Sequence, residues 1–79
     1  MRIEQIVQLT TDDDIASLRE RLDRIQAGTV VVIVPEGATV LRSLVSMRLL
    51  RRYARQMGIE ITVVTRDRAT ADVARLQGF

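Results

Sequence analysis

The 79-residue chain contains no cysteine and no histidine. Without cysteine it can form neither a disulfide nor a thiolate metal site, and without histidine it lacks the usual general base and the commonest metal ligand. Lysine is also absent, so the phosphate-gripping lysine of a P-loop is missing. The serines lie within predicted helices without an activating base. The sequence therefore indicates a non-catalytic protein, and we predict no catalytic residue.

Aromatic residues and long apolar runs are equally scarce. Tyr53 and Phe79 are the only aromatic residues, so the core must be aliphatic. The longest apolar run, residues 30–34, is far below the roughly 20 residues that span a bilayer. The first residues also lack the pattern of a signal peptide. We therefore expect no membrane span and a cytoplasmic location.

The composition that remains is typical of one small globular domain. Apolar residues make up 47% of the chain and charged residues 28%. A chain of this length has room for one core at most. All twelve basic residues are arginine, yet the net charge is only +2, which argues against nucleic acid as the partner.

The order of elements predicts an α/β fold. Residues 3–9 and 59–65 alternate in polarity, as in half-exposed strands, whereas residues 29–34 are β-branched throughout, as in a strand covered on both faces. Helices should follow each strand. The first is capped by Thr11 or Asp12 and stops at Gly28, the second runs from Thr39 to residue 56 or 57, and the third opens at Asp67.

Alternating strands and helices imply right-handed parallel crossovers. The polar outer strands belong at the edges, so we predict a three-stranded parallel sheet of order 1-2-3 with βαβαβα topology. Both crossover helices should lie on one face, which leaves only the short third helix for the other.

Acidic residues follow each predicted strand, at the sheet edge where open α/β proteins bind ligands. Carboxylates gathered there could bind Mg²⁺ and a nucleotide or phosphoester. The alternative is that each caps or neutralises a helix N-terminus. The candidate ligands are Asp12, Asp14, Glu36 and Asp67.

The second predicted helix has an apolar first half that reaches more than one face. Such a segment needs a partner besides the sheet, and self-association would supply one. The candidate interface residues are Val40, Leu41, Leu44 and Val45.

The same helix carries a stripe of arginines at i, i+3, i+4 and i+7. They could bind phosphates, or form a solvated face paired with Glu20 and Asp23 of the first helix. The stripe consists of Arg48, Arg51, Arg52 and Arg55.

Several short runs together resemble one bacterial domain. They are residues 12–15, Arg21-Leu22, residues 32–35, residues 49–52 and residues 64–67. The chain resembles the N-terminal, Rossmann-like α/β domain of uncharacterised, often membrane-anchored bacterial proteins. The resemblance implies a Rossmann-like half-fold, with residues 1–79 as one domain of a longer chain, and it carries no activity or site residues with it.

These observations favour an interaction or regulatory module of a larger protein. Its partner would be a second copy or the remainder of the same chain. The Mg²⁺-dependent site and the phosphate-binding stripe remain as alternatives.

Overall fold

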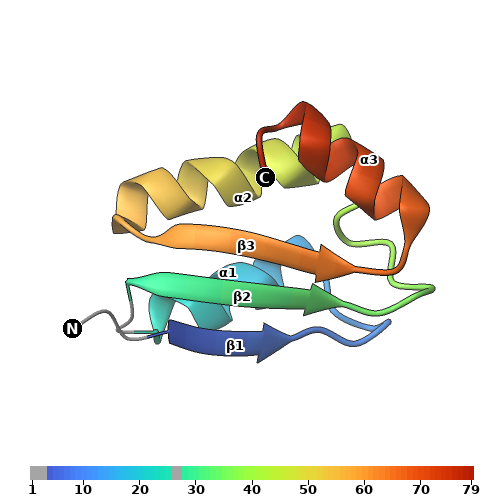
Figure 1. Ribbon diagram of the computed structural model, residues 1–79. Helices are drawn as coiled ribbons and strands as arrows, with labels where there is room; N and C mark the ends of the chain where they lie inside the picture. Colours follow the sequence, from blue (N-terminus) through green and yellow to red (C-terminus); the bar gives the residue numbers. More distant parts are fainter. Residues whose placement is uncertain (1–3, 26–27) are drawn as a thin grey trace.

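A computed structural model describes residues 4–25 and 28–79 (Figure 1). Its elements follow in the order β1 (Glu4–Gln8), α1 (Ile15–Asp23), β2 (Thr29–Val34), α2 (Leu44–Met57), β3 (Glu60–Thr65) and α3 (Arg68–Leu76). The three strands form one parallel sheet of order β1-β2-β3. The predicted α/β class, strand order and alternation of elements are confirmed.

The register aligns three cross-strand rows on each face of the sheet. Val7, Val32 and Val63 form one row that points to the core, and Ile6, Val31 and Thr62 form the adjacent row on the opposite face. Side chains alternate between faces because the strand repeat is two residues. In β2, Val30, Val32 and Val34 are buried, while Thr29, Val31 and Ile33 are only partly covered.

All three helices lie on one side of the sheet (Figure 1). The helix α3 packs against β3 and α2, and its Ala74 belongs to the same buried cluster as the residues of α1 and α2. The prediction that β2 is covered on both faces is therefore wrong. The third helix joins the first two instead of crossing to the far face, which no helix of the described chain covers.

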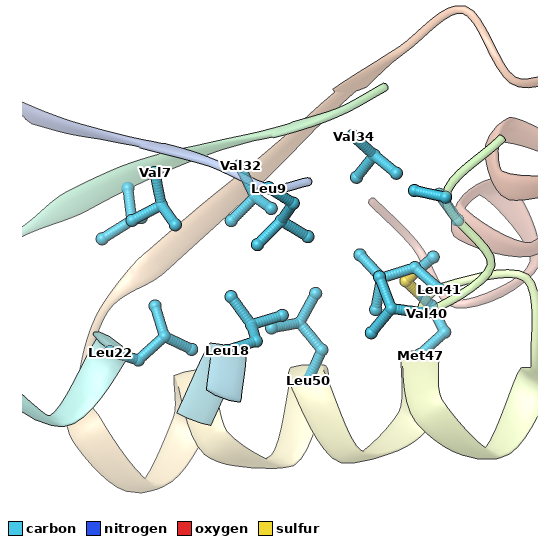
Figure 2. Close-up of a cluster of buried hydrophobic side chains, with 13 residues drawn as sticks. Val7, Leu9, Leu18, Leu22, Val32, Val34, Val40, Leu41, Met47 and Leu50 are labelled. Carbon is cyan, nitrogen blue, oxygen red and sulfur yellow. The ribbon is translucent and has the colours of Figure 1, made fainter. Parts of the chain in front are cut away.

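The core lies between the sheet and the helices (Figure 2). Leu18 and Leu22 of α1 and Leu50 of α2 point toward Val7 and Val32, and all five side chains are almost fully buried. Burying aliphatic side chains of this size contributes roughly 1.5–3 kcal/mol each. The predicted aliphatic core is confirmed.

The first helix begins later than predicted. Asp14 is its N-cap: its carboxylate accepts a hydrogen bond from Ser17 N (2.8 Å), and its own N–H donates to Ser17 Oγ (3.0 Å). This capping box satisfies free N–H groups of the first turn. Neither Thr11 nor Asp12 caps the helix. The helix also ends at Asp23, well before Gly28.

The second helix also begins later than predicted. Its N-cap is Ser43 and not Thr39. Residues 39–42 form a turn, closed by a hydrogen bond from Arg42 N to Thr39 O (3.1 Å). The turn directs Val40 and Leu41 inward to pack near Met47 (Figure 2). The helix ends at Met57, as predicted, and Gly58 follows it in the left-handed conformation at φ 67°.

The third helix begins at the predicted cap. The carboxylate of Asp67 accepts hydrogen bonds from Thr70 N (2.9 Å) and Thr70 Oγ1 (2.7 Å). No helix in the described part of the chain is long and apolar enough to cross a membrane.

Candidate functional site

The carboxylates at the carboxyl ends of the strands have structural partners. Asp14 caps α1, and Asp67 caps α3. Asp67 also receives two hydrogen bonds from Arg42, one from Nε (3.0 Å) and one from Nη2 (2.7 Å). Such a two-point contact is the strongest form of arginine–carboxylate pairing. It fastens the turn before α2 to the start of α3.

The electrostatics of this edge follow from those contacts. The Arg42 hydrogen bonds, followed by those from Thr70, hold the pKa of Asp67 far below its usual range. Asp67 in turn raises the pKa of Arg42. The pKa of Asp13 is also lowered, chiefly because Thr10 N donates to its carboxylate (2.7 Å). Both aspartates are therefore held as anions by the protein itself.

The predicted magnesium site is not assembled. Within residues 4–25 and 28–79, no three acidic side chains gather so that they could hold a metal ion. Asp12 and Glu36 are exposed on separate loops, while Asp14 and Asp67 serve as caps. The capping interpretation is confirmed for those two residues.

The predicted apolar helix face divides into two environments. Val40 and Leu41 are core residues, with Leu41 fully buried, so neither can lie in an interface of the folded domain. Leu44 and Val45 begin α2 and are 38% and 65% exposed. The helical spacing of the four residues was misleading because the first two belong to a turn.

A larger unpartnered apolar surface lies on the far side of the sheet. Ile6 on β1 is 61% exposed and Val64 on β3 is 48% exposed, with the partly covered Val31 and Ile33 of β2 between them. We call these four residues the open sheet face. The register places Ile6 beside Val31 and Ile33 beside Val64, so the four side chains are adjacent. Gln8, Thr29 and Thr62 share this face and are uncharged, whereas the exposed Glu4 and Glu60 flank Thr29 in the row at its amino end.

The open sheet face leads into a hollow at the carboxyl end of β2 and β3. The hollow has a volume of about 440 Å³. Its lining includes Ile33 and Val64 of the open sheet face together with Pro35, Glu36 and Arg66. This is the edge at which open α/β sheets bind their ligands. Here its wall is mostly apolar, so it is suited to receive an apolar side chain.

The arginines of α2 lie on the helical side of the molecule. Arg48, Arg52 and Arg55 are exposed, and Arg51 is half-buried, with Nη1 donating a hydrogen bond to Gln77 O at the end of α3. The predicted pairing with α1 does not occur: Glu20 pairs with Arg24 of its own helix (3.0 Å). Beyond the shared core, the two helices are linked by a cation–π interaction, with Arg19 4.9 Å from the ring centre of Tyr53.

The open sheet face was not among the predicted sites, although its signals are present in the sequence. Ile6 is apolar among the outward residues of an edge strand, and Val64 continues the apolar run of β3 on the outward position. These signals were missed because the short third helix was expected to cover this face. Because β2 is uncovered on this side, the apolar residues of β1 and β3 join those of β2 in one patch.

Comparison with known proteins finds no family model, no curated protein and no solved structure that matches the chain.

Proposed function

We propose that this domain is a non-catalytic interaction module that associates with a second copy through the open sheet face. The observation that carries the proposal is the exposure of Ile6 and Val64 beside Val31 and Ile33 on a sheet face without a helix. Contiguous apolar patches of this kind mark interaction surfaces in soluble proteins.

A second copy fits this face because the face is neutral at its centre. In a two-fold dimer the same patch meets itself, so a charge close to the axis would meet a like charge. The two rows that contain Ile6, Val31, Ile33 and Val64 are completed by Thr62 and Gln8. Two such faces can pack as the layers of a β-sandwich do, about 10 Å apart.

The dimensions of the face set the strength of the association. The whole uncovered side of the sheet, six residues long at ~3.3 Å per residue and three strands wide at ~4.8 Å, has a projected area of roughly 300 Å² and contains the open sheet face. Stable interfaces bury about 800 Å² per partner. The open sheet face alone therefore supports a weak dimer, and the adjacent hollow adds contact area where an apolar side chain can insert.

Two matched valine variants test the proposal. Val64→Arg places a charge on the open sheet face, and Val45→Arg places the same charge on the exposed start of α2. We expect wild type and Val45→Arg to show the same monomer–dimer equilibrium in sedimentation, and Val64→Arg to remain monomeric. Circular dichroism should show all three folded, because both side chains already contact water.

Two results would contradict the proposal. One is a wild-type chain that stays strictly monomeric at millimolar concentration. The other is a dimer that Val45→Arg disrupts and Val64→Arg does not, which would place the interface on Leu44 and Val45.

We also propose that the module acts in the cytoplasm as one domain of a larger bacterial protein, of a class whose members are often membrane-anchored. Support comes from the residue runs that resemble such domains and from the charged, cysteine-free composition. Reading the gene beyond the codon for Phe79 tests the proposal: a hydrophobic span in the same frame is the expected result. In a longer chain, the remainder of the chain competes with a second copy for the open sheet face. A longer chain that is monomeric would favour the remainder as the occupant.

A further inference from the structure

Four arginines surround a hollow on the helical side of the molecule, away from the open sheet face. The hollow has a volume of about 450 Å³ and lies between α2 and the end of α3. Its lining consists of Arg48, Arg51, Arg52, Arg55, Leu76 and Gln77. A volume of this size is within the range of small-ligand sites.

These arginines form no ion pair with the acidic residues that the structure describes. The ion pairs among residues 4–25 and 28–79 involve Arg21, Arg24, Arg42 and Arg75, and none involves an arginine of the hollow. No acidic residue occurs between Gly37 and Ile59, so α2 itself supplies no carboxylate. The hollow is therefore strongly positive in a chain whose net charge is only +2.

The spacing of the arginines makes the cluster unfavourable in the absence of an anion. Arg48 and Arg52 are four residues apart on α2, as are Arg51 and Arg55. Like charges at this spacing repel each other on a helix surface. Only Arg55 lies in the last turn, where the helix dipole favours a cation. An anion that bound all four guanidinium groups would remove the repulsion.

One of the four guanidinium groups is already held in place. Arg51 Nη1 donates to Gln77 O, and the backbone of Gly78 approaches closely at φ 80°. A β-carbon at Gly78 would lie 2.5 Å from Arg51 Nη1, so glycine leaves the space that the guanidinium occupies. Because Arg51 is held before binding, its side chain loses less conformational entropy when a ligand binds.

We propose that this hollow binds a compact polyphosphate anion, a chain of two or three phosphoryl groups. Guanidinium groups form paired, charge-assisted hydrogen bonds with phosphate oxygens. From Arg48 to Arg55 the helix rises about 10 Å, so the four groups converge on a short ligand. A single-stranded nucleic acid would also need aromatic side chains for base stacking, and no aromatic residue lines the hollow.

Calorimetric titration with inorganic tripolyphosphate at low salt tests the proposal. We expect saturable one-to-one binding that falls steeply with added salt, together with an increase in the thermal unfolding midpoint. Amide chemical shifts should change along α2 and at Leu76 and Gln77. The double variant R52Q/R55Q should weaken binding at least about tenfold, because it removes two charge-assisted contacts.

The control variant R24Q/R68Q removes the same total charge from outside the hollow, and should change the affinity less than about threefold because exposed distant charges are screened. Val64→Arg should also leave binding intact, which separates this site from the open sheet face. Gly78→Ala should weaken binding by displacing Arg51, with circular dichroism used to confirm the fold.

Three results would overturn the proposal. The first is the absence of saturable tripolyphosphate binding. The second is an equal loss of affinity in both double variants, which would show attraction by net charge alone. The third is binding of duplex DNA without binding of tripolyphosphate, which would make the arginines a nucleic-acid backbone contact.

Discussion

The apolar side chains that point between the sheet and the helices are the buried ones, and their burial stabilises the domain. Leu41 points there from the turn before α2 and is fully buried, whereas Val45, on the first turn of the helix, is 65% exposed. Leu41 packs in the cluster that includes Val34 and Met47 (Figure 2). The two residues are four positions apart in the sequence and have opposite roles.

Truncating these two side chains should therefore give different results. We expect Leu41→Ala to lower the free energy of unfolding by about 2–5 kcal/mol, through lost burial and the cavity left behind. A domain of this size has only about 4–12 kcal/mol in total, so the loss is severe. Val45→Ala should change it by less than about 0.5 kcal/mol. Urea unfolding followed by circular dichroism measures both, and similar losses would contradict the assigned environments.

At the scale of the elements, each helix begins at a polar side chain that accepts a backbone N–H: Asp14, Ser43 and Asp67. Only Asp67 was identified from the sequence. Before α1, several consecutive residues could each cap a helix, and the choice of Asp14 depends on its reciprocal bonds with Ser17. Before α2, the apolar spacing extends upstream of the first helical residue, Leu44. It does so because Val40 and Leu41 point into the core from a turn. Local sequence cannot distinguish a helical face from a turn that points inward.

The start of α2 can be tested with two hydroxyl residues. Ser43→Ala removes the side chain that accepts from Ser46 N, and should cost about 1 kcal/mol of stability. Thr39→Ala should be nearly neutral, because Thr39 is exposed and closes its turn through its backbone carbonyl. Thermal unfolding measures both. A larger effect at Thr39 would show that the helix begins there.

The Asp67 cap of α3 should make the free energy of unfolding depend on pH in the acidic range. The pKa of Asp67 is lowered in the folded state, so its contribution is complete above its unfolded pKa of about 3.9 and is lost as the pH falls toward the folded value. Asp67→Asn keeps a capping side chain but removes the pair with Arg42. We expect the variant to be less stable than wild type at neutral pH, and the difference to shrink below about pH 4. Asp13 contributes with the same sign in both proteins. A difference that stays constant with pH would contradict the assignment.

At the scale of the whole molecule, the strand order was predictable but the layering was not. Residues 29–34 are apolar enough for the centre of a sheet, and short right-handed crossovers fix the order β1-β2-β3 and the common side of α1 and α2. Nothing comparable fixes α3, because no strand follows it among the described residues. Its side depends on tertiary contacts: Ala74 in the core, Arg51 bonded to Gln77, and Asp67 paired with Arg42.

This placement of α3 gives the molecule two different surfaces. The helical side contains the arginine hollow, and the other side contains the open sheet face, with Glu4 and Glu60 at its amino end. A three-stranded sheet covered on one face is a two-layer structure. Its uncovered apolar residues are the reason to expect association.

The most direct test of the open sheet face as the contact between copies is a nuclear Overhauser measurement on mixed samples. Equal amounts of ¹³C-labelled and unlabelled chain are combined at high concentration, and only contacts between copies are recorded. We predict intermolecular contacts from the methyl groups of Ile6, Val31, Ile33 and Val64. Intermolecular contacts confined to Leu44 and Val45 would contradict the account.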